Sequence, residues 1–153
     1  MTEKPMMPER PCGACGEGTM RPADVSGFVM EHRDDPRVRV GEQLVLPVCD
    51  ICGDMALNAA DTDALEAALE RSYRRKRLRQ QRALINDLRR GGLTQVQIER
   101  FASLSPGYLS KLRNGKLASG ATFRLLYLLH QLRGVAVRAV SRIDPRLRDV
   151  SAR

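Results

Sequence analysis

The chain of 153 residues carries 26 Lys/Arg against 18 Asp/Glu, a formal net charge of +8, and its length allows one compact domain or two small ones. The apolar run at residues 125–129 is too short to cross a membrane, and residues 1–11 are charged and Pro-rich, unlike an export signal. We therefore expect a cytoplasmic protein without a membrane segment.

The charge is divided unevenly along the chain. Residues 1–61 hold 6 Lys/Arg and 11 Asp/Glu, a net of −5, whereas residues 62–153 hold 20 and 7, a net of +13. Such a division indicates two modules with different partners. The acidic module suits a basic protein partner, and the basic module can contact nucleic-acid phosphates.

Two Cys-x-x-Cys-Gly motifs use all the cysteines of the chain: Cys12, Cys15, Cys49 and Cys52. Each turn can direct two thiolates at one ion, and two turns complete a closed tetrahedral shell. Gly16 and Gly53 suit the positive φ that such turns need. The pattern predicts one structural Zn²⁺ ion bound by the four cysteines.

Other roles for the cysteines have less support from the sequence, but two of them stay open. Disulfides need an oxidising compartment, and redox catalysis by one motif needs a βαβ context that is missing here. Iron in the four-thiolate site stays open as an alternative to zinc. A redox switch that releases the metal on oxidation stays open as a side hypothesis.

Short β-prone runs lie between the two motifs, at residues 28–32, 37–40 and 44–48, with turn residues at 34–36 and 41–42. We expect one small antiparallel sheet whose ends are pinned by the metal. A module of this size buries little apolar surface, which is the situation that a structural metal remedies. His32 is expected to be an ordinary strand residue rather than a ligand.

From Thr62 to about Arg90 the pattern is helical, with Asp63 in the position of an N-cap. An apolar face is formed at four-residue steps by Leu65, Leu69 and Tyr73. Residues 71–82 carry seven basic residues and no acidic one. This run is typical of a solvated helix face or a connector, with phosphate contact as the alternative.

The next segment predicts two short helices joined by a turn. Thr94 and Gln97 form a capping box, and Ser103 lies in the turn. The second helix is expected to be capped by Ser105, with Pro106 in its first position. A final amphipathic helix is expected at residues 121–133, with an apolar face made of Phe123, Leu125, Leu126, Leu129 and Leu132.

The two short helices resemble the Cro/C1-type repressor pattern Leu-Thr-Gln-x-x-Ile followed by Ser-x-x-x-Leu-Ser-x-x-x-x-Gly. The matching residues are Leu93, Thr94, Gln95, Ile98, Ser105, Leu109, Ser110 and Gly115. The chain departs from the pattern at Glu99, where a small residue is usual, at Ser103, where glycine is usual, and at Arg113, where an acid is usual. We expect Glu99 at the edge of its helix.

The resemblance implies that the second helix lies in the major groove of a DNA operator. Lys111 is the expected guanine contact, and Gln95 and Lys116 are expected at phosphates. The whole expected DNA-binding set is Gln95, Ser105, Gly107, Tyr108, Ser110, Lys111, Arg113 and Lys116. Because one module reads few base pairs, we expect a homodimer on a palindromic site.

A cysteine-rich module followed by this helix-turn-helix resembles MqsA-type antitoxins over roughly residues 11–133. The resemblance implies a type II antitoxin whose zinc domain neutralises a ribonuclease toxin and whose second domain represses its own operon. Lys111 replaces a base-contacting arginine of that family and Gly107 an asparagine, so a different operator is expected. The alternative is a free-standing zinc-containing transcriptional regulator without a toxin partner.

The expected fold is α+β, a zinc-bound antiparallel β module followed by an all-α helix-turn-helix domain. The expected parts are a zinc-binding domain at 1–70, a basic helical connector at 71–82, the helix-turn-helix domain at 83–133 and an Arg-rich tail at 134–153. No enzyme is expected, since no cysteine is left as a nucleophile and the sequence has no Gly-rich phosphate loop.

Overall fold

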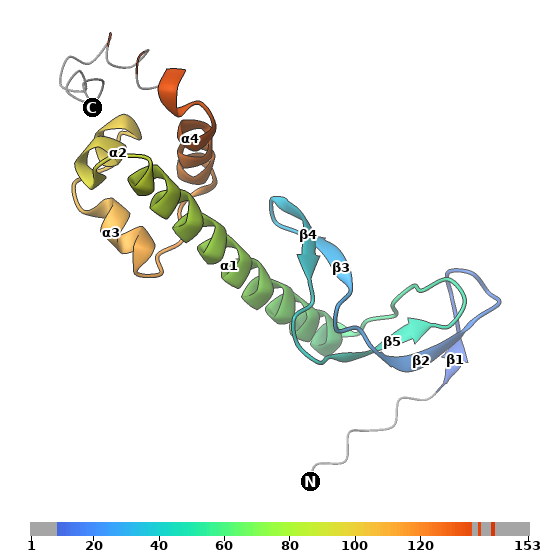
Figure 1. Ribbon diagram of the computed structural model, residues 1–153. Coiled ribbons are helices and arrows are strands. Elements are labelled where there is room, and N and C mark those ends of the chain that lie inside the picture. The colour runs from blue at the N-terminus through green and yellow to red at the C-terminus, as the bar shows by residue number, and fades with distance from the viewer. Residues whose placement is uncertain (1–8, 136–137, 139–141, 143–153) are drawn as a thin grey trace. The chain divides into compact units, whose positions relative to one another are not determined.

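The computed structural model describes residues 9–135 together with residues 138 and 142, so most of the expected tail at 134–153 lies outside the described residues. Strands occupy the N-terminal part and helices follow, which confirms the predicted α+β fold (Figure 1). The chain divides into two compact units between Tyr73 and Arg74, inside helix α1 (Ala59–Arg90). Over the described residues, no helix combines the length and the apolar character needed to cross a membrane.

The first sheet has the strand order β1-β2-β5, with β1 at Arg10–Pro11, β2 at Thr19–Asp24 and β5 at Val45–Cys49. Both pairings are antiparallel, so β2 begins at the end of the sheet where β1 and β5 finish. The segments that follow β1 and β5 are thereby brought together. Strand β2 was not predicted, because its proline and its lack of apolar alternation argue against a strand.

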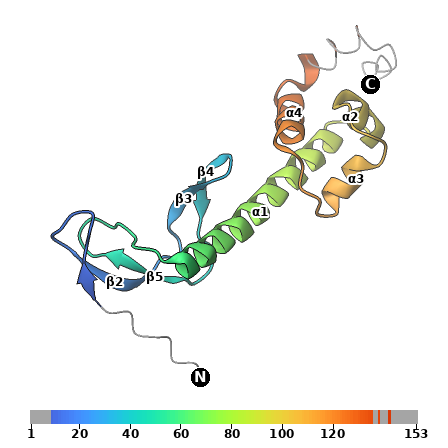
Figure 2. The same ribbon diagram turned by 180° about the vertical axis from the view of Figure 1, so that it is seen from behind.

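The second sheet is a hairpin of β3 (Val29–His32) and β4 (Asp35–Arg39), seen from behind in Figure 2. The expectation of a single sheet is therefore wrong: among the described strands, β3 and β4 pair only with each other. The turn is formed by Arg33, whose φ of 56° is left-handed, and Asp34. The turn thus lies before Pro36, which belongs to β4. Because β4 pairs with β3 on one edge, its other edge tolerates the missing N–H of a proline.

The core of the first unit lies between strand residues and the first half of α1. Its buried members are Val25, Val38, Val40, Leu46, Val48, Leu65, Ala68, Leu69 and Tyr73, which include the predicted apolar face of the helix. The Tyr73 hydroxyl donates to Asp34 at 2.7 Å, and His32 Nε2 lies 3.0 Å from Glu70 Oε2. The hydrogen bond from His32, helped by the charge of Arg33, lowers the pKa of Glu70.

Helix α1 begins three residues earlier than expected. Asn58 accepts a hydrogen bond from the Asp61 backbone N–H at 2.8 Å through its side-chain oxygen, which is the N-cap geometry. The prediction of Asp63 as the cap is therefore wrong, and Asp63 lies inside the first turns of the helix. Ala59 and Ala60 after the cap favour this earlier start, because alanine has the best helix propensity.

The second unit contains the end of α1 and three short helices, α2 (Gln95–Phe101), α3 (Tyr108–Arg113) and α4 (Gly120–Gln131). Their shared core is Ile85, Leu88, Leu93, Ile98, Leu109, Leu112, Leu126 and Leu129. The predicted capping box of Thr94 and Gln97 is confirmed. Leu125 and Leu132, expected in the core, are 37% and 52% exposed, because α4 turns the face of Leu126 and Leu129 inward.

The basic run at 71–82 is more than a solvated face, because Gln81 inside it is fully buried. Its amide Nε2 donates to the carbonyls of Leu112 and Lys116, both at 2.7 Å, and its Oε1 accepts from the Ala118 N–H at 2.8 Å. One side chain of α1 thus satisfies three backbone groups of the segment that ends α3. In the same stretch of α1, the Arg77 guanidinium lies 3.8 Å from the ring centroid of Phe123.

Gln81→Leu is expected to destabilise the second unit, because it leaves three backbone groups without their partner at a cost of roughly 1–3 kcal/mol for each one that stays buried. Gln80→Leu is the matched control, since Gln80 is the preceding residue of the same helix and is exposed. Hydrogen exchange of the amides of α2–α4, followed by mass spectrometry, measures the effect. Equal protection in the two variants would contradict this role of Gln81.

Candidate metal centre and nucleic-acid interface

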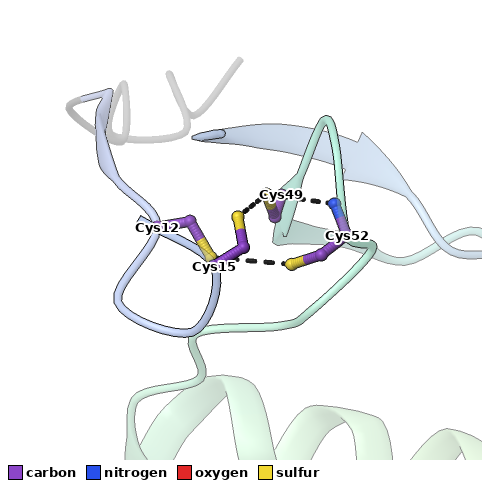
Figure 3. A group of neighbouring side chains, drawn as sticks. All are labelled: Cys12, Cys15, Cys49 and Cys52. Carbon is purple, nitrogen blue, oxygen red and sulfur yellow. Dashed lines mark hydrogen bonds between the residues drawn. The ribbon is translucent and has the colours of Figure 1, made fainter. Parts of the chain in front are cut away.

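The four cysteines that were predicted to bind the metal lie close together (Figure 3). Their sulfur atoms all lie within 4.8 Å of one another, with Cys12 to Cys52 at 3.7 Å and Cys15 to Cys49 at 3.8 Å. A tetrahedral zinc ion with Zn–S bonds of about 2.3 Å separates its sulfurs by about 3.8 Å. The four cysteines are free of disulfides, and their arrangement can hold one metal ion and is consistent with zinc.

The two cysteine turns repeat one backbone design. In each turn, the predicted glycine donates its N–H to the carbonyl of the first cysteine, Gly16 to Cys12 at 3.0 Å and Gly53 to Cys49 at 3.1 Å. Both glycines have the expected left-handed φ, at 72° and 73°. Backbone N–H groups also point at sulfur: the Ile51 and Cys52 N–H groups donate to Cys49 Sγ at 3.4 and 3.5 Å. These bonds help to fix the position of the Cys49 sulfur.

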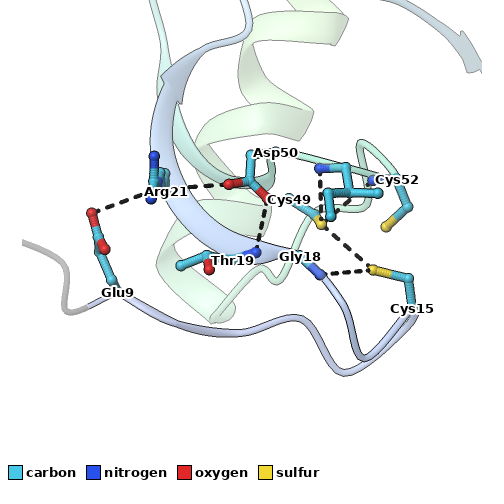
Figure 4. A network of polar contacts seen from close by, with 9 residues as sticks. Glu9, Cys15, Gly18, Thr19, Arg21, Cys49, Asp50 and Cys52 are labelled. Atoms are coloured by element: carbon cyan, nitrogen blue, oxygen red, sulfur yellow. Dashed lines mark hydrogen bonds and ion pairs between the residues drawn. The ribbon is translucent and has the colours of Figure 1, made fainter.

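Asp50, within the second cysteine turn, joins it to strand β2 (Figure 4). One of its carboxylate oxygens accepts from the Thr19 N–H at 2.8 Å, and the other lies 3.8 Å from Arg21 Nε. Arg21 in turn lies 3.6 Å from Glu9. The Arg21 ion pairs are exposed and stabilise little by themselves. The hydrogen bond to Thr19 fixes the second turn against the start of β2.

Two of the four thiols, Cys15 and Cys52, have very different pKa values in the metal-free protein. Hydrogen bonds from the Gly18 and Glu17 backbone N–H groups lower the pKa of Cys15 to about 6. The Asp54 backbone acts to lower the pKa of Cys52, but Cys49, desolvation and the other thiols outweigh it and raise that pKa to about 12. One thiolate is thus ready at neutral pH, and a divalent cation has to displace the proton of another.

Gly18 belongs to the cysteine cluster but was not predicted from the sequence. A methyl group on its Cα would overlap Cys49 Sγ and come within 3.0 Å of an Asp50 carboxylate oxygen. Its N–H also donates to Cys15 Sγ at 3.4 Å, and its carbonyl accepts from the Cys12 N–H at 2.8 Å. The first cysteine turn therefore passes so close to Cys49 that only glycine fits there. The sequence did contain a signal for this role. Gly18 is a second glycine within three residues of Cys15, and the Cys-x-x-Cys-Gly motif does not account for it.

Gly18→Ala is expected to weaken metal binding about 10–100-fold, as loss of support around a metal ligand does, because the new methyl group displaces the Cys49 sulfur. Gly13→Ala is the matched control, since a methyl group at Gly13 meets no atom within 4 Å. Competition against a chromogenic chelator measures both affinities. Equal affinities for the two variants would show that the close approach at Gly18 is unimportant.

Metal affinity is expected to rise with pH. Binding needs thiolates, so at neutral pH it expels the proton of Cys52, and below about pH 6 it must also expel the proton of Cys15. Each proton released changes the affinity about tenfold per pH unit, so affinity falls more steeply on the acid side of pH 6. Chelator competition across this range, with calorimetry in buffers of different ionisation enthalpy, counts the protons. A pH-independent affinity would exclude thiolate ligation.

The helix-turn-helix differs from expectation at the start of α3. The helix begins at Tyr108 after Gly107, whose φ is 78°, so Ser105 is not the cap and Pro106 is not the first helical residue. Gly107 has no side chain to cap the helix. The carboxylate of Glu99 takes this role: its oxygens accept from the Gly107 N–H at 3.1 Å and the Leu109 N–H at 2.9 Å.

Glu99 was expected at the edge of its helix, but it is buried, with only 4% of its surface exposed. It is stabilised there by hydrogen bonds and by the favourable interaction of an anion with a helix N-terminus. Gln95 completes the network, because its amide Nε2 donates to Glu99 Oε1 and to Ser110 Oγ, both at 3.0 Å. Two residues expected at DNA, Gln95 and Ser110, thus also bind each other.

The other residues of the expected DNA set differ in exposure. Three basic side chains, Lys111, Arg113 and Lys116, are exposed on α3 and just after it, as is Ser105 before it. Lys116 Nζ lies 4.4 Å from the ring centroid of the half-buried Tyr108. The helix ends with Asn114 as its C-cap, and Gly115 after it has a left-handed φ of 103°. The structure brings these residues together on one helix and its flanks.

Comparison with protein-family models, with curated proteins and with solved structures gives no match to this chain. Its function is therefore inferred from the two sites themselves.

Proposed function

We propose that this protein is a DNA-binding antitoxin and autorepressor whose first unit holds one structural zinc ion. The observation that carries the proposal is that the charge division follows the structural division. Up to Tyr73 the chain has 7 Lys/Arg and 14 Asp/Glu, a net of −7, and from Arg74 it has 19 and 4, a net of +15. Opposite fields on separate units favour an acidic and a basic partner, respectively.

DNA binding by the second unit is supported by how α3 is held. Both ends of this helix are fixed by buried polar side chains, Glu99 at its start and Gln81 at its end. Lys111, Arg113 and Lys116 are left exposed on and just after it. A short, rigidly held helix with exposed basic residues suits insertion into the major groove, with Lys111 at a base edge and Lys116 at a phosphate.

A homodimer is supported by an apolar stripe that the core does not cover. Leu125, Leu128, Leu132 and Val135 follow one another at three- and four-residue steps on α4 and just past its end, and they are 37–60% exposed. Residues at these steps share one face of a helix, which places Leu125 and Leu128 together on α4. A second copy of this chain can bury the stripe, and the pair then reads two half-sites of a palindrome.

The antitoxin role of the first unit is supported by its acidic charge and by exposed apolar side chains. Phe28, Val29 and Ile51 are 41%, 46% and 63% exposed, and Ile51 lies between two metal-site cysteines. Acidic charge with exposed apolar groups suits a basic protein such as a ribonuclease toxin. The MqsA-like order of a cysteine-rich module and a helix-turn-helix adds to this support. The alternative is a free-standing zinc-containing transcriptional regulator, and neither role is enzymatic.

Lys111→Ala is expected to weaken binding to the DNA upstream of the protein's own gene by roughly 1–3 kcal/mol and to relax its sequence preference. Lys116→Ala is expected to weaken specific and random DNA alike, with a shallower salt dependence. Fluorescence anisotropy with both duplexes measures each effect. Unchanged affinity and preference in Lys111→Ala would refute the assignment of α3 as the recognition helix.

The two roles are expected to separate when the chain is cut between Tyr73 and Arg74. This cut keeps Tyr73 with the first core and Gln81 with the second. Residues 1–73 should suppress the toxicity of a basic protein encoded beside this gene without binding DNA, and residues 74–153 should bind DNA without rescue. Growth of cells that express the neighbouring gene is the measurement. A harmless neighbour, or rescue by residues 74–153, would favour the free-standing regulator.

A further inference from the structure

A hollow of about 400 Å³ in the second unit has a lining made only of polar and basic residues: Arg82, Asn86, Ser110, Arg113 and Asn114. Its volume falls within the range of ligand pockets, roughly 300–1,000 Å³. We infer that this hollow is a phosphate-binding site between α1 and the end of α3.

The charges in the hollow call for an anion. Two arginines, Arg82 and Arg113, line it without any acidic residue, and neither has an ion-pair partner among the described residues. Two such cations in one hollow repel each other, and a bound anion removes the repulsion. The Arg82 Nε–H donates to the Arg113 carbonyl at 3.2 Å, which fixes the position of that guanidinium.

The neutral residues that line the hollow favour phosphate as the anion. Asn86 and Asn114 can each donate through an amide NH₂, whereas the Ser110 hydroxyl already donates to Gln95 Oε1 at 3.3 Å. Donors from two elements suit a group whose oxygens point in several directions, and arginine matches phosphate oxygens with two parallel hydrogen bonds. The lining has no apolar side chain that would hold a hydrophobic ligand body.

The phosphate can come from a DNA backbone or from a free phosphorylated molecule. Ser110 and Arg113 also belong to the residues expected to face DNA, so the position of the hollow favours a backbone phosphate. That choice rests on the proposed function, whereas phosphate binding itself rests only on the composition and geometry of the hollow.

Two variants of the full-length protein test the site. Arg113→Gln removes a guanidinium that makes no ion pair among the described residues. Asn86→Asp keeps the size of the side chain but places a carboxylate beside the two arginines, where it competes with phosphate. The new carboxylate also pairs with those arginines, so the melting temperature should be unchanged or higher, which separates lost binding from unfolding. Arg90→Gln is the control, because Arg90 lies on the same helix and is already paired with Asp87 at 2.7 Å.

Each variant is measured with two probes, pyrophosphate at constant ionic strength and a random-sequence duplex over a range of salt concentrations. If a backbone phosphate occupies the hollow, both variants should lower the salt slope of duplex binding by about one, with the control unchanged. If a free phosphorylated molecule occupies it, both variants should weaken pyrophosphate binding at least about tenfold. Asn86→Asp, which lies outside the expected DNA-binding set, should then leave the slope unchanged.

The inference is overturned if both variants behave like Arg90→Gln with pyrophosphate and with DNA. Failure of the proposed function is a separate result. In that case the wild type binds no duplex at all, and the pyrophosphate measurement still decides whether the hollow is a phosphate site.

Discussion

The end of the first sheet depends on the meeting of four sulfur atoms. Among the described residues, the apolar cluster there contains, apart from cysteines, Met20 and the partly buried Ala56, and it is separate from the main core of the unit. Strand β1 has only two residues, so its own hydrogen bonds hold little. A metal ion bound by all four thiolates would supplement this small apolar cluster. The first cysteine turn, the start of β2 and the end of β5 are then fixed together.

The second unit solves a similar problem with buried polar side chains. Helix α3 has six residues, too few to be stable in isolation. Glu99 satisfies N–H groups at its start, and Gln81 satisfies carbonyl groups at its end. Both side chains come from neighbouring helices and are almost fully buried. The helix is therefore held by its surroundings at both ends, while Lys111 and Arg113 on it stay exposed.

The features that the sequence predicted are those with a local signal. Paired cysteines at fixed spacing predicted their meeting point, and Thr94 with Gln97 predicted the start of α2, because both patterns act within a few residues. Strand β2 has no such pattern, and its place follows from pairing with β5 far along the chain. Gln81 and Glu99 were missed for the same reason. A glutamine among basic residues and a glutamate in a polar helix look exposed until the distant backbone groups that they satisfy are known.

The hydrogen bond between Glu99 and Gly107 has a consequence for how this motif can evolve. A small residue at position 99 would leave the N–H groups of Gly107 and Leu109 unpaired, unless a capping side chain appeared near position 107. A lineage that changed position 99 first would pass through an intermediate less stable by roughly 1–3 kcal/mol per unpaired group. The two positions are thus expected to change together. Related proteins with a small residue at position 99 should therefore be recognised by comparing positions 99 and 107 together rather than one at a time.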